Sequence, residues 1–238
     1  CIHREKPPAQ SQAEPHGEPN SLADLNTLVN ELPKLHKNLF FRLPEGLWRT
    51  LASDVERELP KMNRAKLAVL FATLVAAVGD SHTGLTLEAL PEFGRLPVML
   101  RVFPDGLYVI EAARDLAALR GKKLARLGRL TADEARAAVA PVISHDNAGH
   151  LAARVAQILT IPEVLHALGI TDRPDHASVE TADGAVFELA RVASWREVDW
   201  YAPSEIVPRH RAKPGLAYWN DWLPAEKTLY FKYNRCAD

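Results

Sequence analysis

The spacing of the apolar residues changes abruptly at Gly79, and this change limits the folds that the chain can adopt. Between Ser21 and Gly79, leucines and valines recur every three or four residues, which is the period of an amphipathic helix. From 98 to 112, two short apolar runs flank Pro-Asp-Gly at 104–106, which is a hairpin signal. The pattern therefore predicts an α+β fold whose first part is helical.

The helical part is predicted to hold three helices. The first begins at Ser21, and the second starts near Pro44 and ends at Pro60. The third runs from about Asn63 to Gly79, a residue that suits a left-handed helix cap.

The second part alternates short strands with short helices. Strands are predicted over 98–103, 107–112, 124–127, 177–181 and 185–192, and helices over 131–140, 148–159 and 162–168. The proline-rich stretch 194–227 is predicted to be an irregular linker, and 228–233 a final strand. A lone strand cannot satisfy its own backbone groups. It is therefore either an edge strand of the preceding sheet or, the alternative we favour, the start of a further domain.

Composition excludes several classes of function. The 238 residues are 47% hydrophobic and 25% charged, which is typical of a folded domain. A net charge of −1 argues against nucleic acid as a partner. The longest apolar run, 67–78, is too short to span a bilayer. We find no phosphate loop or dinucleotide fingerprint, so we expect no cofactor.

The N-terminal residues suggest a tether. Cys1 is followed by a polar, proline-rich stretch that reaches Asn20 and cannot bury enough surface to fold. This arrangement resembles a mature bacterial lipoprotein, in which the thiol of Cys1 carries lipid and the stretch 1–20 holds the domain off the membrane. The alternative is an arbitrary cut in the chain. Cys1 and Cys236 are the two cysteines, so no disulfide framework is expected.

The hexapeptide at 79–84, Gly-Asp-Ser-His-Thr-Gly, is the main candidate site. It places His82 beside the hydroxyl of Ser81 and the carboxylate of Asp80, at a junction where side chains reach solvent. An imidazole is suited to act as a general base towards a hydroxyl nucleophile. The alternative is that Asp80 and Ser81 satisfy backbone groups at the helix end while His82 is packed and hydrogen-bonded.

Together these segments resemble the tail-specific (C-terminal-processing) serine peptidase family, in its tricorn-like branch. The resemblance rests on the order of the hexapeptide, Asp-Gly-Leu-Tyr-Val at 105–109, the segments 119–124 and 143–147, and the closing strand 228–234. It implies an N-terminal helical region at 21–95, a PDZ-like module at 96–193, a linker at 194–227, and the first strand of a truncated crotonase-like α/β peptidase domain at 228–238.

The resemblance also implies roles for residues. His82 would be the general base and Ser81 its polarising neighbour. Asp80 is a candidate for the third group, which fixes the tautomer of the imidazole, if the turn places its carboxylate next to the ring. The nucleophilic serine would lie after Asp238, so the chain alone is expected to be inactive. The expected substrate is unfolded or extended polypeptide, bound by strand addition. The expected location is the periplasmic side of the cell envelope, with a membrane tether through Cys1.

The sequence leaves two other functions open. The first is a lipid-anchored, non-enzymatic peptide-binding or scaffold protein. The second is a metal hydrolase that uses His145 and His150, although their spacing differs from that of a helical ligand pair and residues 144–147 suit a helix cap.

Overall fold

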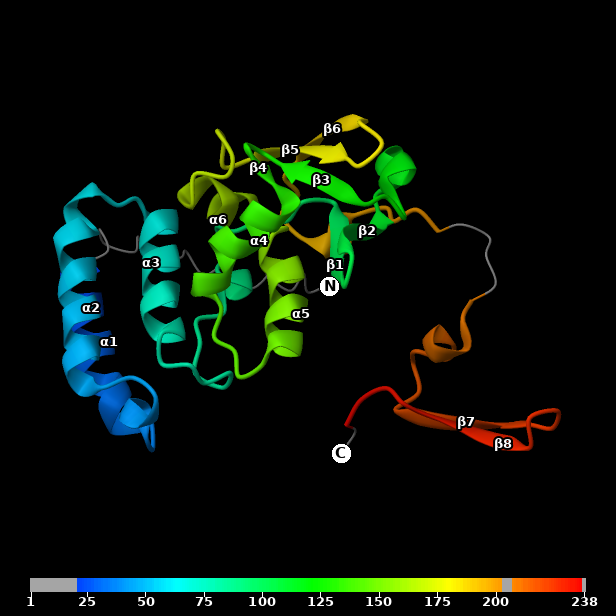
Figure 1. Cartoon of the computed structure of the whole chain (residues 1–238), viewed down its shortest axis with the longest axis horizontal. Helices are drawn as coiled ribbons and strands as arrows, with labels where there is room; N and C mark the ends of the chain where they lie inside the picture. Colours follow the sequence, from blue (N-terminus) through cyan, green and yellow to red (C-terminus); the bar gives the residue numbers. More distant parts are fainter. Residues whose placement is uncertain (1–20, 203–206, 237–238) are drawn as a thin grey trace, which may run out of the picture. The chain divides into compact units, whose positions relative to one another are not determined.

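The chain forms two compact units in a computed structural model that describes residues 21–202 and 207–236. The first unit extends to Tyr201 and the second begins at Ala202 (Figure 1). The predicted tether at 1–20, with the proposed lipid attachment at Cys1, lies outside the described residues. Among the described helices, we find none with the length and hydropathy required to cross a membrane.

Three helices open the first unit, as the sequence predicts. They are α1 (Ser21–Leu35), α2 (Glu45–Glu58) and α3 (Arg64–Ala76). Asn63 caps α3 by accepting a hydrogen bond from the backbone N–H of Lys66 at 2.9 Å. Trp48 of α2 is completely buried, and its indole N–H donates to the carbonyl of Val29 at 3.3 Å.

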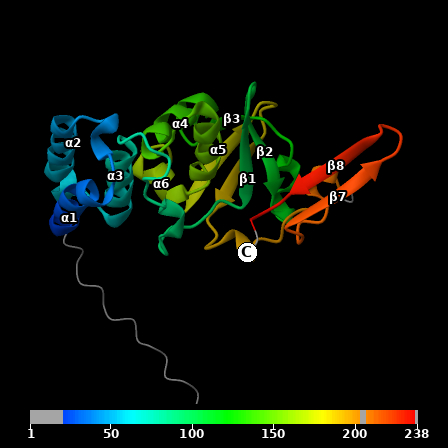
Figure 2. The same ribbon diagram turned by 90° about the horizontal axis from the view of Figure 1, so that it is seen from below.

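Helix α3 is apolar on both sides and belongs to two hydrophobic cores. Leu67 and Leu74 pack with α1 and α2, as does Val78 just after the helix, whereas Val69 and Ala72 pack with the strands and helices that follow. Figure 1 shows α3 standing between these two groups of elements, and Figure 2 shows the same order from below. The helical part is thus joined to the rest of the unit through a shared helix.

The second part of the unit combines a hairpin, a small sheet and three helices. Strands β1 (Val98–Phe103) and β2 (Gly106–Ala112) pair antiparallel. A four-stranded antiparallel sheet has the order β4-β3-β5-β6, with β3 (Leu124–Leu127), β4 (Leu130–Thr131), β5 (His176–Thr181) and β6 (Val186–Ala190). The helices are α4 (Ala132–Val139), α5 (Ala148–Ile158) and α6 (Pro162–Ala167).

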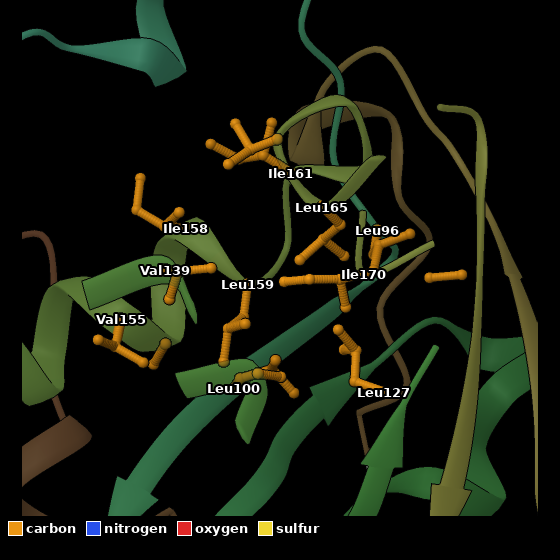
Figure 3. Packing of buried hydrophobic residues seen from close by; sticks show 14 of the residues in the cluster. Leu96, Leu100, Leu127, Val139, Val155, Ile158, Leu159, Ile161, Leu165 and Ile170 are labelled. Atoms are coloured by element: carbon orange, nitrogen blue, oxygen red, sulfur yellow. The ribbon is translucent and has the colours of Figure 1, made fainter. Parts of the chain in front are cut away.

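These elements confirm the predicted α+β class and the predicted order of strands and helices. The predicted turn at 104–106 joins β1 to β2, and the helix after Thr131 begins with a capping box to Glu134. Figure 3 shows the core that results, in which Val139, Val155 and Leu165 from the helices meet Leu100 and Leu127 from the strands.

The stretch 194–227 differs from the predicted irregular linker at both ends. At the start, the indole N–H of Trp195 donates to the carbonyl of Leu96 at 2.8 Å, and Trp200 forms a β-bridge with Ala113. At the end, β7 (Tyr218–Leu223) pairs antiparallel with β8 (Thr228–Tyr233). The expectation of a lone final strand is therefore wrong, because β7 supplies the partner that its backbone requires.

The two faces of the β7–β8 hairpin differ in exposure. On one face Trp219 is buried, with the ammonium of Lys213 4.7 Å from its ring centre and Tyr230 beside it. The other face is apolar and exposed, and we call it the open hairpin face. Its members are Tyr218, Trp222, Leu229, Phe231 and Tyr233.

We expect Trp48→Ala to lower the free energy of unfolding by about 3–5 kcal/mol, because it leaves a large cavity between α1 and α2. The neighbouring Leu47 is 48% exposed, so Leu47→Ala is the matched control and should cost only about 0.5 kcal/mol. Urea denaturation followed by far-UV circular dichroism measures both values. Equal losses for the two variants would contradict the described packing of α2.

Candidate functional site

The hexapeptide begins where α3 ends, and a glycine allows the chain to turn there. Gly79 has a φ of +74°, a left-handed conformation that confirms the predicted cap. The guanidinium of Arg42 donates to the carbonyl of Gly79 at 2.7 Å. The start of the hexapeptide is thus held both by α3 and by the loop between α1 and α2.

Asp80 accepts hydrogen bonds from three donors. Its Oδ1 accepts from the backbone N–H of His82 at 3.0 Å, and its Oδ2 accepts from the hydroxyl of Thr83 at 2.9 Å and from His36 Nε2 at 3.0 Å. The Nδ1 of His36 accepts from the backbone N–H of Asn38, so Nε2 is the nitrogen that carries the proton. Asp80 therefore fixes the backbone of the hexapeptide and ties it to the end of α1.

These contacts favour the ionised form of Asp80. The backbone N–H of His82 is the largest cause, followed by His36 and Thr83, and together they hold the pKa of Asp80 well below its ordinary value of 3.8. Asp80 contributes to stability above that ordinary value, and this contribution is lost as the pH falls below it.

Ser81 links His82 to a second carboxylate, that of Asp146. The backbone N–H of Ser81 donates to Asp146 Oδ1 at 3.0 Å, and the Ser81 hydroxyl donates to Asp146 Oδ2. The same hydroxyl oxygen lies 3.3 Å from His82 Nδ1. These hydrogen bonds, that from the hydroxyl first, lower the pKa of Asp146. The result is a carboxylate–hydroxyl–imidazole chain from Asp146 to His82.

The imidazole of His82 is open to solvent, with its side chain 92% exposed. The structure therefore does not bury His82 in the core, which was part of the alternative interpretation of the hexapeptide. The other part holds, since Asp80 and Ser81 do bind backbone and side-chain groups at the helix end. Asp80 Oδ1 lies 3.6 Å from His82 Nδ1, farther than Ser81 Oγ.

Two cavities flank the hexapeptide. One of about 250 Å³ lies beside Asp80 and is lined by His36, Arg42 and Asp146 among others. The other, of about 330 Å³, is lined by Ser81, His82, Ser144 and Arg154 among others. His82 thus stands at the edge of a polar hollow large enough for a small part of a substrate.

The histidines of the metal-hydrolase alternative do not form a ligand cluster in the described part of the chain. His145 Nδ1 contacts the carbonyl of Ile143 at 2.8 Å, and the backbone N–H of His150 donates to Asn147, the N-cap of α5. The ligand atoms that do lie close together belong to Asp80, His82 and Asp146, all within 4.8 Å of one another. These residues could hold a metal ion only by giving up hydrogen bonds that the carboxylates already accept.

Two residues of the site were not found from the sequence. His36 is 44 positions from Asp80 and Asp146 is 65 positions from Ser81, so no local spacing connects either pair. Asp146 stands next to Asn147, the N-cap of α5. The sequence suggested a helix cap for this segment or, with His145 and His150, a metal site, and it gave no link to the hexapeptide. The tertiary structure places His36, which follows α1, and Asp146, which precedes α5, in contact with the hexapeptide.

Comparison with known proteins gives a likeness in fold. We found no matching family model and no matching curated protein sequence. Two solved structures of CPAF, a tail-specific-protease-like serine protease from Chlamydia, match with a TM-score of 0.50 each. A serine-to-alanine mutant is 18% identical and aligns over 77% of this chain, and mature CPAF complexed with lactacystin is 17% identical and aligns over 79%.

The match covers 34% and 36% of the two CPAF chains, so this chain spans about a third of their length. At this identity the likeness shows the fold alone. The chain therefore shares an α+β fold with part of CPAF.

We expect Asp80→Asn to destabilise the protein most above about pH 4, where the wild-type carboxylate is ionised and accepts three hydrogen bonds. The difference in unfolding free energy between wild type and variant should shrink as the pH falls below 3.8. Urea denaturation at a series of pH values measures it. Glu56→Gln on α2 controls for the change in net charge, and a difference that stays constant from neutral to acid pH would refute the role given to Asp80.

Proposed function

We propose that this chain is the base-bearing and substrate-binding portion of a serine endopeptidase of the tail-specific type. The observation that carries the proposal is the exposed imidazole of His82, oriented through Ser81 by Asp146. The fold shared with part of CPAF supports it. The finer assignment to the tricorn-like branch rests on the histidine of the hexapeptide and stays a prediction.

The hydrogen-bond chain favours one tautomer of the neutral His82 ring in the proposed reaction. Because the Ser81 hydroxyl donates its hydrogen bond to Asp146, its oxygen is free to accept a hydrogen bond from Nδ1–H of His82. The lone pair then lies on Nε2 of an exposed ring. Nε2 takes the proton of a serine hydroxyl while the oxygen of that hydroxyl attacks the substrate carbonyl. Nε2 later returns the proton to the leaving amine.

The nucleophile is proposed to be a serine outside these 238 residues. The open hairpin face is consistent with this arrangement, because a two-stranded hairpin with exposed apolar side chains gains stability when further structure covers it. We propose that β7 and β8 belong to the crotonase-like peptidase domain. Attachment through Cys1 and a location in the cell envelope remain part of the proposal and rest on the sequence of residues 1–20.

A groove beside β1 is the proposed place for an extended polypeptide. The groove has a volume of about 530 Å³ and is lined by Leu100 and Val102 of β1 and by Ala152 and Ala153 of α5. Helix α5 lies alongside β1 in both views (Figure 1, Figure 2). A strand edge next to a helix is the arrangement that binds peptides by strand addition, as in the PDZ-like module predicted for 96–193.

The backbone of β1 is free on the side of the groove. Val109, opposite Leu100, donates its N–H to Lys122 and accepts from Gly121, so its polar groups point away from β1. In an antiparallel pair the groups of Leu100 then also point away from β2. In the described sheets β1 has β2 as its one neighbour, so these groups face the groove and can pair with a substrate strand.

We expect His82→Ala to lower kcat/KM for an unfolded, fluorescence-quenched casein substrate by about 10²–10⁴-fold, the usual contribution of a general base. The protein is expressed from its complete coding sequence, and His210→Ala, an exposed histidine on the second unit, is the matched control. The 238-residue chain alone should cleave nothing. Activity that survives loss of His82 would exclude the proposed base, and a complete protein without any activity would favour a non-enzymatic binding protein.

We expect Asp146→Asn to lower kcat by about 10- to 100-fold with little change in KM, an effect typical of removing a partner that orients a functional side chain. In the variant, an amide NH₂ group, which donates hydrogen bonds, replaces the carboxylate oxygen that accepts from the Ser81 hydroxyl. The orientation of His82 is therefore lost. Asp133→Asn, at a position with 83% side-chain exposure on α4, is the control. Equal kinetics for Asp146→Asn and wild type would show that Asp146 has no part in positioning the base.

A further inference from the structure

The end of the groove at the start of β1 is where a peptide's terminal carboxylate would lie if the module recognised chain ends. Capture of a carboxylate at the end of an added strand requires several free backbone N–H groups or an unpaired cation. The segment that leads into β1, residues 94–97, passes this end of the groove, because Trp195, which lines the groove, donates to the carbonyl of Leu96.

The backbone N–H groups of this segment already have partners. That of Arg95 donates to the carbonyl of Val192 at 2.8 Å, and that of Leu96 donates to the carbonyl of Thr160 at 2.7 Å. Residue 97 is a proline and has no N–H. The segment therefore offers no set of free donors to an incoming anion.

The first N–H of the segment is taken by a carboxylate of the protein itself. The N–H of Gly94 lies 3.1 Å from both oxygens of Glu163, a residue of α6 that is 8% exposed. The same carboxylate accepts from the guanidinium of Arg191, which also donates to the carbonyl of Glu92 at 3.0 Å. Glu163 thus already binds the N–H of Gly94 and the guanidinium of Arg191, the donor and the cation that a bound carboxylate would need.

The segment has little room to rearrange. A Cβ atom placed on Gly94 would lie 2.6 Å from the carbonyl oxygen of Val192 and closer still to Arg191, so the backbone there is tightly enclosed. The cation nearest the segment, Arg95, donates to the carbonyl of Gly94 and has its guanidinium 5.6 Å from the ring centre of Trp195. Arg101 lines the groove farther along β1 and is exposed.

We propose that the groove binds internal segments of extended polypeptide and does not recognise a free C-terminal carboxylate. This inference rests on the proposed strand addition at β1. The helix wall of the groove consists mostly of small residues, so the favoured segments carry large apolar side chains at alternate positions. The small wall residues are Gly149, Ala152, Ala153 and Ala156, and Gln157 is the remaining residue of α5 that lines the groove.

Three fluorescein-labelled peptides test the proposal by fluorescence anisotropy with the 238-residue chain. All three contain the sequence Ser-Val-Thr-Leu-Ser-Val. In the first peptide this sequence ends in a free carboxylate, and in the second it ends in a carboxamide. In the third it continues into Gly-Ser-Gly-Ser, which ends in an amide. We expect the three dissociation constants to agree within about threefold. A groove that binds the carboxylate through charge-assisted hydrogen bonds would prefer the free acid by about tenfold or more.

The variant Ala153→Trp identifies the binding site, because Ala153 is exposed and its side chain lines the groove. It should abolish binding of all three peptides, whereas Ala118→Trp, an exposed alanine outside the groove, should not. A tenfold preference for the free acid, lost in Ala153→Trp, would overturn the inference and leave the proposed peptide groove intact. Failure of every peptide to bind, or binding that Ala153→Trp does not affect, would overturn the proposed groove itself and the inference with it.

Discussion

Burial of α3 on both of its sides is the constraint on which the rest of the first unit depends. Leu67 and Leu74 fill the core of the helical part, and Ala72 fills the core formed with the strands. A helix packed in this way has little freedom to shift or rotate, because each side is held by close contacts. The hexapeptide that begins at Gly79 therefore leaves α3 at a fixed place and in a fixed direction.

The hexapeptide is then secured from two directions by groups that are distant in the chain. His36, at the end of α1, reaches Asp80, and Asp146, just before α5, reaches Ser81. Both carboxylates have lowered pKa values because N–H and O–H donors surround them. These contacts hold the loop while the His82 ring stays exposed, and an exposed ring on a restrained backbone is what a general base requires.

The hairpin of β1 and β2 serves the core and the groove at once. Leu100 and Val109 bury their side chains in the main core, and the backbone of β2 is bonded on its far side to residues 121–122. The backbone of β1 is left open next to α5, a helix whose groove side carries mostly alanine and glycine. Side chains thus stabilise the fold, while main-chain groups remain free for the proposed peptide, a division that follows from the alternation of a strand.

Local patterns in the sequence determined the α+β class, the order of the elements and the place of the hexapeptide, because period, capping residues and turn residues act over a few positions. The partners of the hexapeptide were decided by tertiary structure alone, since packing around α3 brings together residues such as Ser81 and Asp146 that no spacing relates. The same holds for β7, whose residues 218–223 form a strand because β8 pairs with them. Strand pairing and side-chain contacts between distant segments gain their energy only when the chain is folded, so the sequence pattern by itself could not reveal them.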